Sequence, residues 1–114
     1  MKLSERALEP LAQMVIGDNP LFPYRSSYFI TRFFTRCGLD YAHDGTTRCV
    51  WTREVLRELN LGPSDSPDLP SNAILRILDE LFDRFEFDQG GKSVEDALDH
   101  LNKLFSREGL EGLL

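Results

Sequence analysis

Apolar residues recur at helical spacing through most of this chain, and glycine and proline divide the pattern into five segments. The spacing predicts helices over residues 3–16, 26–36, 52–60, 71–85 and 93–106. Only residues 46–51 alternate weakly and are rich in β-formers, so they are the one candidate for a short strand or extended arm. We therefore expect an all-α fold, a compact bundle of about five helices with at most one short β element.

Several details of these helices follow from single residues. Four aromatics in seven residues (Tyr28, Phe29, Phe33, Phe34) make the second helix too apolar to be one-sided. We expect it to be the most buried element, although a dimer interface would have the same pattern. Ser4, Thr52 and Ser93 are candidate N-caps. Pro10 indicates that the first helix either starts just before it or is kinked there.

Length and composition predict one domain over residues 1–114. The chain has 114 residues, of which 41% are hydrophobic, enough for a single core. It contains no apolar run long enough to span a membrane, and the charged start Met1–Arg6 does not resemble a signal peptide. We expect a cytoplasmic protein without membrane contact. In that compartment Cys37 and Cys49 are expected to be reduced, small and buried.

The net charge of −6 is unevenly distributed. Residues 1–60 carry eight Lys or Arg against seven Asp or Glu, whereas residues 61–114 carry five against twelve. An acidic domain repels phosphate on average, which argues against nucleic-acid binding by the whole surface. A local face of arginines is still compatible with this charge.

Five arginines are candidates for such a face: Arg32, Arg36, Arg48, Arg53 and Arg57. Arg32 and Arg36 lie one helical turn apart, and so do Arg53 and Arg57. Because the guanidinium group binds phosphate and carboxylate in a planar, bidentate way, a shared face suits nucleic acid or an acidic protein. The other interpretation, which we favour, is that these arginines pair with carboxylates of the same domain.

Catalytic, metal and helix-turn-helix patterns are weak. Cys37, His43 and Cys49 lack the usual zinc spacing. Arg36 and His43 fit an R-x6-H ribonuclease pattern, but Gly38 and a turn at Asp44-Gly45 interrupt it. The connection between the second and third helices, about fifteen residues, is too long for a helix-turn-helix motif. We expect a binding domain with no catalytic residue, metal or cofactor.

Three segments together resemble the small N-terminal domains of abortive-infection (AbiJ-like) proteins. The first is Ile16-Gly17-Asp18 followed by Pro23-Tyr24-Arg25-Ser26. The second runs from Phe33-Phe34 through Cys37-Gly38-Leu39 to Thr52-Arg53 and Leu59-Asn60. The third is Ala97-Leu98 through Leu101-Asn102 to Gly109-Leu110.

This resemblance implies a non-catalytic sensor or adaptor domain of a bacterial antiphage system, placed ahead of an effector domain. Its partner would be a protein, with nucleic acid as the alternative. Tyr24 and Arg25 are the candidate binding residues that the resemblance supplies. A structural interpretation of the same motif has Pro23 set the turn, Tyr24 pack and Ser26 cap the second helix. The apolar Leu110, Leu113 and Leu114 suggest a chain that continues or a tail that docks.

Overall fold

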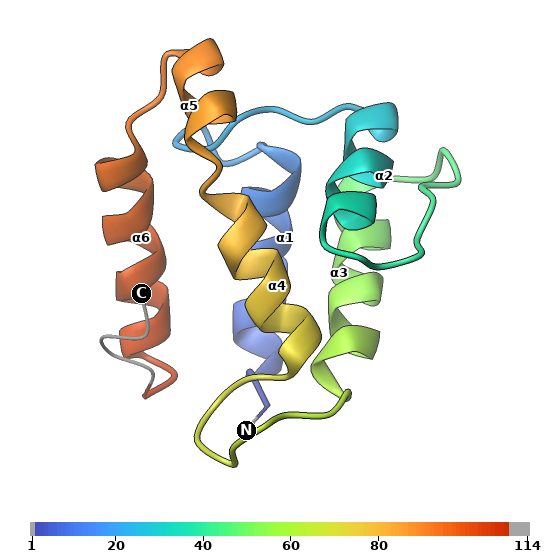
Figure 1. Cartoon of the computed structure of the whole chain (residues 1–114), viewed down its shortest axis with the longest axis vertical. Coiled ribbons are helices and arrows are strands. Elements are labelled where there is room, and N and C mark those ends of the chain that lie inside the picture. The colour runs from blue at the N-terminus through green and yellow to red at the C-terminus, as the bar shows by residue number, and fades with distance from the viewer. Residues whose placement is uncertain (1, 110–114) are drawn as a thin grey trace.

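The computed structural model describes residues 2–109, and all of the regular structure in that range is helical (Figure 1). The six helices are α1 (Glu5–Ile16), α2 (Ser27–Arg36), α3 (Arg48–Asn60), α4 (Asn72–Leu81), α5 (Arg84–Gly90) and α6 (Val94–Ser106). The Cα radius of gyration is 13.2 Å, close to the ~13–14 Å expected of a compact domain of this length. The expected all-α bundle is confirmed. Leu110, Leu113 and Leu114 lie outside the described residues.

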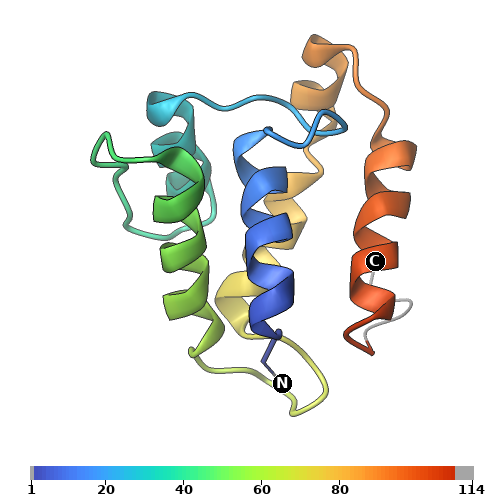
Figure 2. The ribbon, with the colours of Figure 1, turned by 180° about the vertical axis from the view of Figure 1, so that it is seen from behind.

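Helix α1 is the centre of the bundle, and α3, α4 and α6 surround it (Figures 1 and 2). Most of its side chains are buried: Ala7, Leu8, Leu11, Ala12, Met14, Val15 and Ile16. Pro10 lies inside this helix, so of the two alternatives for Pro10 a start just before it is wrong. Ser4 is at the N-cap position, but its hydroxyl contacts Glu108 instead of a backbone amide of the helix.

The expectation that α2 is the most buried element is wrong. Phe33 and Phe34 are buried, and the Phe34 ring contacts those of Tyr41 and Trp51. Tyr28 and Phe29, in the first turn, are instead more than half exposed. Burial therefore changes along this helix as well as around it, because Ile30, Phe33 and Phe34 pack on the core whereas the two rings of the first turn do not.

Residues 46–51, the candidate for a short strand or an extended arm, form neither, because α3 already begins at Arg48. Thr47 occupies the N-cap position that we assigned to Thr52, and Thr52 lies buried within the helix. The β-branched and aromatic residues of this stretch suit either structure. Packing of the helix against α1, together with the contact of Trp51 with Phe34, decides in favour of helix. The connection from α2 to α3 is consequently Cys37–Thr47, eleven residues and not fifteen.

The helix expected over residues 71–85 is two helices, α4 and α5. The backbone leaves the helical conformation at Phe82 (φ −104°, ψ 34°). Asp83 then begins α5, because its side chain accepts a hydrogen bond from the amide of Phe85. Gly91, at φ 65°, ends α5, and Ser93 caps α6 by accepting from the amide of Asp96, as expected. After the break at Phe82, α5 lies at the end of the bundle where α2 begins (Figure 1).

Within the described residues, no helix combines the length and the apolar content needed to cross a bilayer. Cys37 and Cys49 are both free thiols, Cys37 buried and Cys49 half-buried. Burial raises the pKa of the Cys37 thiol to about 12, so this side chain stays protonated at neutral pH.

Candidate functional site

The turn between α1 and α2 holds the two short motifs that form the first of the three segments resembling AbiJ-like domains. Gly17 ends α1 in the left-handed region at φ 78°. A Cβ atom at this position would lie 2.1 Å from the carbonyl oxygen of Pro23 and 2.3 Å from the Cα of Tyr24. The amide of Arg25 donates to the carbonyl of Ile16 over 2.8 Å. The two motifs are therefore packed backbone against backbone, which only glycine permits at position 17.

Arg25 is a structural residue in this turn, since its side chain is only 2% exposed. Its Nη1 donates to the carbonyl of Val15 over 2.7 Å, and its guanidinium lies 4.6 Å from the centre of the Phe33 ring. Its Nη2 is 3.1 Å from a carboxylate oxygen of Glu86, although the approach is not aligned for a hydrogen bond. Burial lowers the pKa of Arg25 and the charge of Glu86 opposes that shift. This arginine ties α5 to the end of α1.

Arg48 holds the same turn from the other side. Its guanidinium donates to the carbonyls of Arg25 and Ile16 over 2.8–3.1 Å and pairs with Asp18 over 3.1 Å. The same group lies 4.5 Å from the centre of the Tyr24 ring. Tyr24 therefore packs on Arg48, as the structural interpretation has it, but is still 65% exposed. One face of its ring covers Arg48 and the rest meets solvent.

Arg53 and Arg57 form surface ion pairs. Arg57 bridges Glu5 on α1 and Glu54 on α3, and Arg53 lies 3.5 Å from Glu54. The hydrogen bonds from Arg57 hold the pKa values of both carboxylates below their ordinary range. This is the internal pairing that we favoured from the sequence.

Arg32 and Arg36 lie on the outer side of α2. Arg36 donates to Glu86 over 3.2 Å and is 3.9 Å from Glu80. Arg32 donates to the hydroxyl of Tyr28 and pairs with no carboxylate within the part of the chain that the structure describes. The five candidate arginines are thus divided among three sets of partners: the α1–α2 turn, the surface of α1 and α3, and the edge of α2.

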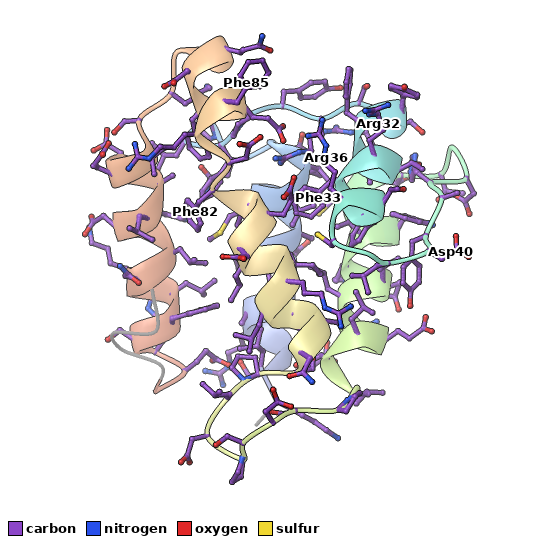
Figure 3. All side chains as sticks on the ribbon, in the orientation of Figure 1. Arg32, Phe33, Arg36, Asp40, Phe82 and Phe85 are labelled. Carbon is purple, nitrogen blue, oxygen red and sulfur yellow. The ribbon has the colours of Figure 1, made fainter. Side chains whose placement is uncertain are left out.

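An aromatic face, defined by Tyr24, Tyr28, Phe29 and Phe85, occupies the edge shared by α2 and α5. These side chains are 65%, 62%, 54% and 68% exposed, and the rings of Tyr28 and Phe29 lie 5.1 Å apart. All but Tyr28 line an open pocket of about 550 Å³, a size typical of ligand sites. Polar side chains of Arg25, Arg36, Glu86, Gln89 and Lys92 complete its wall. Figure 3 shows Phe85 on α5 and Arg36 on α2 at the same end of the molecule.

The residues considered for metal binding and RNA cleavage do not converge. The Cys37 thiol donates to the carbonyl of Arg76. His43 hydrogen-bonds Ser27 through Nδ1 and the carbonyl of Thr46 through Nε2, and its ring contacts Trp51. Because a carbonyl only accepts, Nε2 carries a proton. Arg36 faces α5 instead, so the arrangement does not assemble Arg36 and His43 into a shared cleft.

The one group of potential metal ligands in the described residues is Glu80, Asp83 and Glu86, whose carboxylate oxygens lie within 4.8 Å of one another. Burial and the nearby Asp83 raise the pKa of Glu80. Arg25 and Arg36 pair with members of this group, so arginine already supplies positive charge there. The pattern of acidic residues could not reveal this cluster, because it depends on the break at Phe82.

Sequence reasoning did not identify Phe29 as an exposed residue, and it missed the pocket residues that follow the break at Phe82: Phe85, Glu86, Gln89 and Lys92. Phe85 ended the apolar stripe of a helix that we expected to be continuous. Its place two residues after the Asp83 cap was the available signal that a new helix begins there and turns the ring outward. No protein-family model, curated protein or solved structure matches the chain, so relatives assign none of these residues a role.

Proposed function

We propose that this chain is a non-catalytic protein-interaction domain, of the sensor or adaptor kind, in a bacterial antiphage abortive-infection system. The observation that carries the interaction role is the aromatic face. Of the six large hydrophobic side chains that are exposed in the described residues, four belong to it. Aromatic residues gathered on a solvent-exposed surface mark interaction sites more often than scattered single ones do. The defence setting depends on the resemblance to AbiJ-like domains.

The pairing of the arginines favours a protein partner over nucleic acid. Arg36, Arg48, Arg53 and Arg57 all neutralise carboxylates of the same domain, which leaves little free positive charge for a phosphate backbone. The aromatic face instead offers rings that can enter apolar pockets of a partner or accept a partner's side chains. Rings of this kind dominate the binding energy of protein interfaces.

Site-specific photocrosslinking tests the interaction role. The photoreactive residue p-benzoylphenylalanine replaces Phe85 in the full chain, and in a matched variant it replaces Leu61, which is 63% exposed at the end of α3. In cells that carry the native gene, illumination is expected to give a discrete protein adduct at position 85 and none at position 61. Equal adducts at both positions would show that exposure alone, and not the aromatic face, determines contact.

A phage-plating assay tests the defence setting. The double variant Phe29→Ala/Phe85→Ala, introduced into the native locus, is expected to restore plaque formation by a phage that the wild-type locus restricts. Leu61→Ala is the control and is expected to keep the restriction. Unchanged restriction in the double variant, with the fold verified by circular dichroism, would count against a role of this face in defence.

A further inference from the structure

The pocket beside the aromatic face carries a charge opposite to that of the whole domain. Two cationic side chains, Arg36 and Lys92, line it together with the buried Arg25, whose charge is paired with the one lining carboxylate, Glu86. The chain as a whole carries −6. A local cationic surface on an acidic domain attracts an anionic ligand to that place and away from the rest of the surface.

Lys92 is the cation of this pocket whose charge has no carboxylate partner in the described part of the chain. Its Nζ donates over 2.6 Å to the carbonyl of Pro20, a neutral acceptor. Two of its three ammonium hydrogens remain for a ligand. Arg36 shares Glu86 with Arg25 and is 47% exposed, so it also keeps donors that face solvent.

The neighbouring groups select a carboxylate over a phosphate chain. Glu80, Asp83 and Glu86 stand together at the junction of α4 and α5, next to Arg36. Their charges repel the closely spaced charges of a phosphate chain more strongly than they repel the separated carboxylates of a peptide. The pocket also opens directly onto the rings of Phe29 and Phe85, which suit an apolar side chain next to that carboxylate.

From this geometry we infer that the pocket binds an acidic peptide segment of a partner protein, in which a large apolar side chain is flanked by Asp or Glu. The apolar side chain packs against Phe29 and Phe85, and the carboxylates reach Lys92 and Arg36. This inference rests on the proposed interaction function and adds the chemistry of the partner. Charge reversal at Lys92 tests the acidic nature of the partner separately from the interaction function, because it leaves the aromatic face intact.

The test begins with selection of a random 12-residue peptide display library on the intact chain. The expected consensus combines a large apolar residue with at least two acidic ones. The affinity of the enriched peptide, labelled with fluorescein, is then measured by fluorescence anisotropy. Lys92→Glu is expected to weaken binding by about tenfold or more, as is replacement of the peptide's acidic residues by their amides. Lys103→Glu, on α6, is the matched control and is expected to stay within about twofold.

Four results would overturn the inference. A basic or uncharged consensus, or binding that Lys92→Glu leaves unchanged, removes the acidic peptide but keeps the interaction function if Phe85→Ala still abolishes binding. Binding unaffected by both Lys92→Glu and Phe85→Ala removes the inference and the proposed use of the aromatic face together. Displacement of the peptide by ADP at similar concentration would make the pocket a nucleotide site.

Discussion

Arg25 and Arg57 each join a carboxylate of another helix, yet they occupy opposite environments. Arg25 is buried, reaches the carbonyl of Val15 and the carboxylate of Glu86, and lies over the Phe33 ring. Arg57 is exposed and bridges Glu5 and Glu54. In the interior, an unpaired charge or carbonyl has no water to replace a lost partner, whereas at the surface water and salt replace it at once.

The comparison shows that what an arginine of this chain contributes to the fold depends on the groups around its side chain, and not on its spacing along the sequence. The turn between α1 and α2 uses Arg25 and Arg48 to satisfy backbone carbonyls that no helix can satisfy. The surface between α1 and α3 uses Arg57 only to pair charges. Substitutions in the first region should therefore threaten the fold, and those in the second should change local ionisation.

The largest effect is expected from Arg25→Met. The change removes the donor to Val15 and one partner of Glu86, while methionine keeps most of the packing against Phe33. We expect a loss of about 3 kcal/mol in the free energy of unfolding, measured by urea denaturation, since breaking a buried pair leaves groups uncompensated. The double variant Arg25→Met/Glu86→Met should recover part of that loss. A loss of under about 0.5 kcal/mol in the single variant would show that the pair contributes little.

The next largest effect is expected from Gly17→Ala, in the same turn. Alanine adds a Cβ that meets the backbone of Pro23 and Tyr24 at a positive φ, so the turn must shift as well as adopt a strained conformation. We expect about 2–3 kcal/mol of destabilisation, again from urea denaturation. Gly91→Ala is the matched control, because Gly91 has φ 65° and open space around it. It should cost about 1 kcal/mol, and equal costs at both positions would refute the close approach.

Much of the fold could be predicted because helical periodicity and helix-ending glycines are local signals. The aromatic helix at residues 27–36 and the Ser93 cap of α6 were found in this way. The start of α3 was missed because Thr47 to Trp51 suits strand and helix alike, and packing against α1 makes the choice. The break at Phe82 was missed because the apolar stripe continues across it.

The candidate site was harder to predict than the fold, because its residues come from separate elements. The sequence identified Arg36 and Tyr24 but joined them to arginines that the structure places elsewhere. Phe85 and Lys92 line one pocket with Phe29 because α5 lies at the end of the molecule where α2 begins. Spacing along the chain does not indicate which residues of separate elements line one pocket. The internal pairing of Arg53 and Arg57, in contrast, was predictable from the many nearby carboxylates.

The smallest effect on stability is expected from Arg57→Gln, because Arg57 lies at the surface whereas Arg25 is buried. Hydrogen bonds from Arg57 hold the pKa values of both Glu5 and Glu54 below their ordinary value of 4.5. The variant should raise both pKa values toward 4.5, as followed by NMR titration of the carboxyl carbons, with little change in melting temperature at pH 7. Because the folded-state pKa is the lower one, any stability from this pair is present above pH 4.5 and is lost as pH falls through the folded value. The melting temperatures of variant and wild type should therefore meet in acid. A drop at pH 7 as large as that of Arg25→Met would mean that Arg57 supports the fold as Arg25 does, and that burial does not separate the two regions.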